Sequence, residues 1–165
     1  DPGTAALYED PGSPVRLDPA MGAWRWVTEK SQRGEWEGSI PRGKRNLWRE
    51  ERAAKAYWKE QLRYDPKGQR RRPPGVRVSN GPMADRYDRT RNIPLYDASR
   101  VRCPVLLIVG DHDHTSLDAE VSGLYKALAK SAGKRRIVLG DATHYAQFER
   151  RREALFGEVQ LFLEG

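Results

Sequence analysis

The sequence predicts an α/β fold with a short parallel sheet in its C-terminal part. The apolar run 105–109 has the composition of a strand that is buried on both faces, and 136–139 predicts a second short strand; a glycine follows each run. A helical pattern follows each run, over 116–132 and over 149–164. Strand, helix, strand and helix in this order predict a βαβ unit, whose strands lie parallel in one sheet.

The N-terminal part of the chain predicts helices joined by loops. Residues 1–17 show no periodicity and are expected to form a loop. A first helix is expected over 18–34, because the Asp-Pro pair at its start suits a helix N-terminus. Met21, Trp24 and the pair Trp26-Val27 follow at roughly helical spacing, and Gly34 is the expected stop.

A second helix is expected over 47–62, with Asn46 as its cap, because its apolar residues fall on one stripe. Residues 66–82 are rich in proline and glycine and predict a loop. A short helix is expected to begin within 82–85. At the other end of the chain, the charged residues 149–152 predict a solvated start of the last helix.

Composition limits the classes of protein that the chain can represent. Its 165 residues suit one domain, or a small domain with a long lobe. No apolar run approaches the roughly 20 residues of a membrane-spanning helix. The first residues resemble no signal peptide, so we expect a cytoplasmic protein without a membrane partner. The single cysteine, Cys103, excludes an internal disulfide and a cysteine-rich zinc site.

The net charge of +7 raises the question of an acidic partner. The basic excess lies within residues 1–100, where basic residues are mostly interleaved with acids. The dense run Arg70-Arg71-Arg72 precedes two prolines and is interpreted as a solvated loop. We therefore expect no nucleic-acid partner, with RNA contact by this run as the alternative.

Polar residues follow both predicted strands. Asp111 and Asp113 come after the first strand, and His144 comes after the second. Reactive groups of parallel sheets sit beyond the carboxyl ends of the strands, so an acid and His144 can meet there. A carboxylate that binds one imidazole nitrogen leaves the other free to take a proton from a nucleophile. The residues alone leave both aspartates open as the acid.

Residues 93–164 resemble the C-terminal half of an α/β-hydrolase. The stretches that carry the resemblance are 93–97, 101–109, 110–113, 140–144 and 149–164. In that family an acid follows the seventh strand in a Gly-x-x-Asp setting, and a histidine follows the eighth. The resemblance implies that Asp113 is the triad acid and His144 the general base, with Asp111 as the rival acid.

The resemblance also implies two domains and a missing partner. Residues 1–95 would form a mainly helical cap lobe, and 96–165 the C-terminal part of the hydrolase core. The family's nucleophile lies on a G-x-S-x-G elbow that precedes the acid, and the sequence contains no such elbow. The expected partner is therefore the missing N-terminal half of the same fold, without which this chain is expected to be inactive.

The function implied is hydrolysis of a small-molecule substrate, an apolar ester, through a Ser/His/Asp triad with no metal and no organic cofactor. Weaker candidates for substrate contact are Trp26, Trp36, His114 and Tyr145. The Asp-His-Asp-His segment lacks the further ligands that a zinc site needs. The alternative is a non-catalytic hydrolase remnant, a basic module that binds an acidic partner or RNA.

Overall fold

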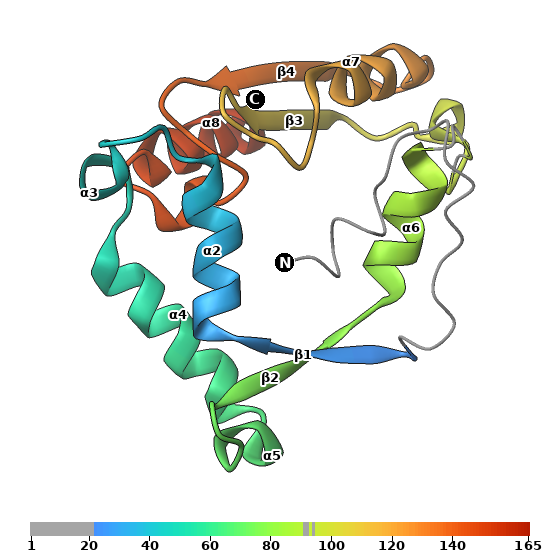
Figure 1. Ribbon diagram of the computed structural model, residues 1–165. Coiled ribbons are helices and arrows are strands. Elements are labelled where there is room, and N and C mark those ends of the chain that lie inside the picture. Colours follow the sequence, from blue (N-terminus) through green and yellow to red (C-terminus); the bar gives the residue numbers. More distant parts are fainter. Residues whose placement is uncertain (1–21, 91–92, 94) are drawn as a thin grey trace. The chain divides into compact units, whose positions relative to one another are not determined.

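The computed structural model describes residues 22–90, 93 and 95–165 (Figure 1). It contains two compact units, each assembled from two stretches of the chain. The β1–β2 unit comprises the described residues up to 32 together with 59–97. The β3–β4 unit comprises 33–58 together with 98–165.

The units relate in part to the domains expected from the sequence. One junction, between 97 and 98, lies close to the expected boundary at 95. Residues 33–58, however, group with the C-terminal residues. The assignment of 1–95 as a cap lobe stays a prediction.

The β1–β2 unit contains a two-stranded antiparallel sheet. Strand β1 (Trp24–Thr28) pairs with β2 (Gly75–Ser79), and Trp26 lies opposite Arg77. The helix expected over 18–34 is therefore wrong for residues 24–28, and residues 18–21 lie outside the described part of the chain. The two tryptophans two positions apart have strand spacing, and their pairing partner lies about 50 residues away.

Short helices complete this unit. They are α5 (Pro66–Gln69) and α6 (Gly81–Thr90), the second of which confirms the helix expected from 82–85. The loop expected over 66–82 is wrong where α5 and β2 form.

Asp65 holds the elements of the β1–β2 unit together. Its carboxylate accepts hydrogen bonds from the Gly68 amide (3.0 Å) and from the Arg77 amide (3.0 Å) and Nε (3.3 Å). These bonds, led by the one from the Arg77 amide, lower the pKa of Asp65. One buried carboxylate thus caps α5 and fixes the edge of β2.

Three helices lie between β1 and α5 along the chain: α2 (Glu29–Ser39), α3 (Arg45–Trp48) and α4 (Glu51–Arg63). Helix α2 continues through Gly34, so the stop expected there is wrong. The single helix expected over 47–62 is interrupted at Arg49 and Glu50. Arg49 instead forms an antiparallel bridge with Glu149, and this non-local pairing breaks the helix.

The β3–β4 unit contains the expected parallel pair (Figure 1). Strand β3 (Val105–Gly110) runs parallel to β4 (Lys134–Leu139), with Ile108 opposite Ile137. Helix α7 (Asp118–Ala127) connects them, and α8 (Arg152–Glu164) follows β4. This arrangement confirms the predicted α/β fold.

Helix α7 is shorter than the helix expected over 116–132. Its N-cap is Leu117, and no side chain caps it. The chain leaves the helix after Ala127, and Leu128, just beyond the helix, is buried.

Two apolar clusters form the core of this unit. The first contains Trp36, Ile40, Trp48 and Ala54, with Tyr145 and Phe148 packed against it. The second contains Leu139, Ala142 and Ala146, with Ile108, Ile137 and Leu155 against it. Both clusters contact the segment that follows β4, which is therefore held from two sides. No helix in the described part of the chain has the length and apolar character needed to cross a bilayer.

Candidate active site

The loops that follow β3 and β4 are joined to each other by hydrogen bonds. The Asp111 amide donates to the Leu139 carbonyl (2.9 Å), and the His112 amide donates to the Ala142 carbonyl (3.0 Å). In return, Oδ1 of Asp111 accepts from the Ala142 amide (3.1 Å). Because these bonds fix one loop against the other, side chains on the two loops have defined relative positions. Asp111 is part of this scaffold.

Asp113 and His144 meet at this edge of the sheet. Oδ2 of Asp113 lies 2.9 Å from Nδ1 of His144. Oδ1 of Asp113 accepts from the amides of Thr115 (2.7 Å) and Ser116 (2.8 Å). The two amides orient the carboxylate, so its second oxygen points at the imidazole.

The two side chains differ in their exposure to solvent. The Asp113 side chain is 5% exposed, whereas that of His144 is 43% exposed. Among the described residues, none forms a hydrogen bond with Nε2 of His144. An ionised Asp113 accepts a hydrogen bond from Nδ1–H, and Nε2 then carries the lone pair. This geometry allows Nε2 to take a proton from an incoming hydroxyl group.

The environment of Asp113 favours its ionised form. Burial opposes ionisation, but the hydrogen bonds from His144 and from the Ser116 and Thr115 amides outweigh it. The pKa of Asp113 consequently lies below its usual value.

This lowered pKa predicts an acid-dependent contribution to stability. The folded state holds the Asp113 proton less tightly than the unfolded state, whose carboxyl has a pKa of about 3.9. The contribution is complete above that value and is lost as the pH falls through the folded-state pKa. Urea unfolding at a series of pH values should show wild type losing its stability advantage over Asp113→Asn below about pH 4. A difference in unfolding free energy between the two proteins that is independent of pH would contradict this expectation.

Aromatic residues surround the His144 loop. The Tyr145 ring lies edge-on to His144, with centroids 5.7 Å apart, and contacts Trp36 at 5.8 Å. Its hydroxyl donates to Glu35 (3.4 Å). Burial, together with the negative charge of Glu35, raises the pKa of Tyr145 to about 12. Tyr145 is therefore a neutral donor at physiological pH.

The structure places the weaker candidates for substrate contact in different surroundings. Tyr145 and Trp36 lie beside the His144 loop, and Trp36 is only 4% exposed, so it belongs to the core. Trp26 belongs to the other compact unit, where the guanidinium of Arg71 stacks on it at 4.3 Å. His114 is exposed.

His112 lies edge-on to Trp48, with centroids 5.1 Å apart. It is therefore packed against the first apolar cluster of the unit. Within the described residues, no group of three or more His, Cys, Asp or Glu side chains is arranged to hold a metal ion.

Sequence reasoning missed Glu149. The charged segment 149–152 was expected to be solvated, but Glu149 has 0% exposure. It accepts hydrogen bonds from Nε1 of Trp36 (2.7 Å), the Thr143 amide (3.0 Å) and the Thr143 hydroxyl (2.6 Å). No local pattern marks such a residue, because one partner lies 113 positions earlier in the chain.

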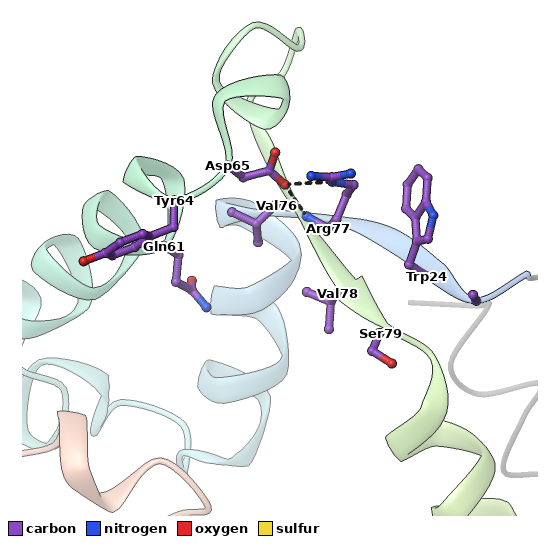
Figure 2. A pocket seen from close by; sticks show the side chains of 9 residues that line it. Trp24, Gln61, Tyr64, Asp65, Val76, Arg77, Val78 and Ser79 are labelled. Atoms are coloured by element: carbon purple, nitrogen blue, oxygen red, sulfur yellow. Dashed lines mark hydrogen bonds and ion pairs between the residues drawn. The ribbon is translucent and has the colours of Figure 1, made fainter.

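A pocket of about 450 Å³ lies in the β1–β2 unit (Figure 2). Trp24, Tyr64 and the Asp65–Arg77 pair contribute to its wall. None of the residues that the sequence proposes for catalysis or substrate contact lines it. The pocket therefore carries no part of the Asp113–His144 arrangement.

A parallel β-α-β arrangement whose strand ends carry an acid and a histidine in contact is the architecture of the α/β-hydrolase class. Comparison with known families identifies the particular family within this class. The family model described as X-Pro dipeptidyl-peptidase (S15 family) matches residues 16–146.

This match spans most of the chain and includes both Asp113 and His144. The chain belongs to the X-Pro dipeptidyl-peptidase (S15) family, which lies within the α/β-hydrolase superfamily. No curated protein and no solved structure gives a significant match.

Proposed function

We propose that this chain provides the acid and the base of a serine hydrolase that cleaves acyl compounds. The observation that carries the proposal is the 2.9 Å contact between Asp113 Oδ2 and His144 Nδ1, with Nε2 of His144 free of described partners. Family membership supports the hydrolase class. Asp113 and His144 are proposed as the catalytic residues.

In this mechanism Nε2 of His144 removes the proton of a serine hydroxyl as the oxygen attacks a carbonyl carbon. The resulting imidazolium is stabilised by the ionised Asp113 carboxylate. His144 then delivers the proton to the leaving group, and the acyl-enzyme forms. In the second half, His144 takes a proton from water as the water oxygen attacks the acyl carbon, and it returns the proton to the serine oxygen as the serine ester bond breaks and the acid is released.

The nucleophile must come from polypeptide outside these 165 residues, because no serine in the sequence has a glycine two positions before and two after it. Within the described part of the chain, β3 pairs with β4 alone, and its other edge is open. Val138 and the α8 residues Phe156, Val159, Leu161 and Leu163 are also exposed. We propose that the nucleophile-bearing part of the hydrolase sheet extends the open edge of β3 and covers apolar residues of this surface.

The substrate is proposed to be a small apolar ester, with a peptide bond that follows proline as the second candidate. The ester proposal rests on general base catalysis by the Asp–His pair, which can activate a serine hydroxyl for attack on a carbonyl carbon. The second candidate is favoured by the activity in the name of the matching family. Residues 1–95 are proposed to form a lobe that restricts access to the site.

The test is labelling with a fluorophosphonate, followed by intact mass measurement. A polypeptide that contains these residues and a candidate nucleophile should gain one adduct, and His144→Ala should reduce the labelling rate by at least about 10³-fold. Assays with a p-nitrophenyl ester and with an X-Pro p-nitroanilide then separate the two substrates. Equal labelling of wild type and His144→Ala would overturn the proposal and leave the basic binding module as the alternative.

A further inference from the structure

Glu149 is a buried carboxylate that the proposed mechanism does not use. It has 0% exposure and forms no ion pair with any described residue. Its three hydrogen-bond partners all donate, which is the set that an ionised carboxylate accepts. Burying such a group is costly unless its bonds are satisfied, so the arrangement of donors around it is strongly constrained.

The backbone of Glu149 is itself fixed. The Arg150 amide donates to the Trp48 carbonyl (2.8 Å), and the Glu50 amide donates to the Phe148 carbonyl (3.4 Å). These bonds join 148–150 to the interruption between α3 and α4. The carboxylate is thus presented from a segment that is anchored independently of the His144 loop.

From this anchored position Glu149 holds the residues on both sides of His144. Oε2 binds the Thr143 amide, and Oε1 binds the Thr143 hydroxyl. The same hydroxyl oxygen accepts from the Tyr145 amide (3.1 Å). A chain of hydrogen bonds therefore runs from Glu149 through Thr143 to Tyr145, and it brackets the backbone of His144.

We propose that Glu149 is a positioning residue for His144, and that it keeps Nδ1 in line with Asp113. The inference rests on the proposed catalytic role of Asp113 and His144. Glu149 lies outside the reacting atoms and acts only through the loop. A displacement of about 1 Å in a catalytic group can cost about 10²-fold in rate. Loss of these hydrogen bonds should therefore reduce turnover rather than substrate binding.

Glu149→Gln tests the proposal, because it preserves the length of the side chain. Its amide group places a donor against either the Thr143 amide or the Trp36 indole, so at least one bond is lost. We expect kcat to fall by about 10–10²-fold with KM changed by less than about twofold. In proton NMR, the Nδ1–H signal of His144 in its bond to Asp113 should exchange faster with solvent than in wild type.

A second variant and a matched control complete the experiment. Thr143→Val removes the hydroxyl but keeps the amide bond to Glu149, and should give a smaller fall in kcat in the same direction. Asp65→Asn alters the buried carboxylate of the other compact unit, which also accepts three hydrogen bonds. It should lower stability and leave the His144 signal unchanged.

The outcomes separate this inference from the proposed function. A wild-type His144 signal that persists unchanged in both Glu149→Gln and Thr143→Val would overturn the positioning role alone. Equal loss of the signal in Asp65→Asn would also overturn it, because general destabilisation would then explain the effect. Absence of an Asp113-dependent signal in wild type would instead contradict the proposed Asp113–His144 pair.

Discussion

Asp113→Asn is expected to lower kcat by about 10⁴-fold in an active polypeptide that contains this chain. The asparagine retains the amide contacts that Asp113 makes with Thr115 and Ser116. It cannot stabilise the imidazolium, and its amide group can hold the wrong tautomer of His144. Measurement of kcat/KM over a range of pH would show the loss at every pH where wild type is active.

Asp111→Asn is the matched control for this prediction. Asp111 is close in sequence, but its Oδ1 binds the Ala142 amide instead of His144. An asparagine oxygen can accept the same hydrogen bond, so we expect a loss of at most about tenfold, equivalent to one weakened bond. A large loss in Asp111→Asn with near-normal activity in Asp113→Asn would assign the acid to Asp111.

Gly110→Ala is expected to lower the stability of the fold. A Cβ atom at Gly110 would lie 2.6 Å from the Ala142 carbonyl carbon and 2.8 Å from the Thr143 carbonyl oxygen. Both obstacles are backbone atoms of the loop that carries His144, so the two loops must separate. Overpacking of this kind costs about 1–3 kcal/mol, and the denaturant midpoint should fall accordingly.

Gly123→Ala provides the control, because it makes the same chemical change within α7. No atom lies within 4 Å of a Cβ built at Gly123. The helix propensity of alanine should therefore raise stability by up to about 1 kcal/mol. If both variants changed stability by the same amount, the close approach of the two loops at Gly110 would not be the cause.

The sequence predicts the β3–β4 unit better than the β1–β2 unit, for a physical reason. The runs of β-branched and aliphatic residues at 105–109 and 137–139 are visible in the sequence, and both form strands of the parallel pair. The loops after these strands could therefore be placed at one edge of the sheet from the sequence alone. That placement predicts that an aspartate and His144 meet there, whereas the choice of Asp113 over Asp111 came from the family resemblance.

The features that could not be predicted depend on residues far apart in the chain. The strand at 24–28 forms because 75–79 pairs with it, and local periodicity there indicated a helix. The interruption at Arg49 exists because 148–150 pairs with it. Glu149 looks solvated within its run of arginines, whereas Trp36 and Thr143 bury it.

The hydrogen bond between Trp36 and Glu149 also has a consequence for synthesis on the ribosome. The two residues are separated by 113 positions, so at about 5–20 residues per second Trp36 is made roughly 6–23 s before its partner. During this interval the Trp48 carbonyl also lacks its hydrogen-bond donor, the Arg150 amide of the 148–150 segment. The nascent chain therefore presents unburied tryptophans until nearly all of these residues have been translated, and this exposure makes it a natural client for chaperones that bind apolar segments.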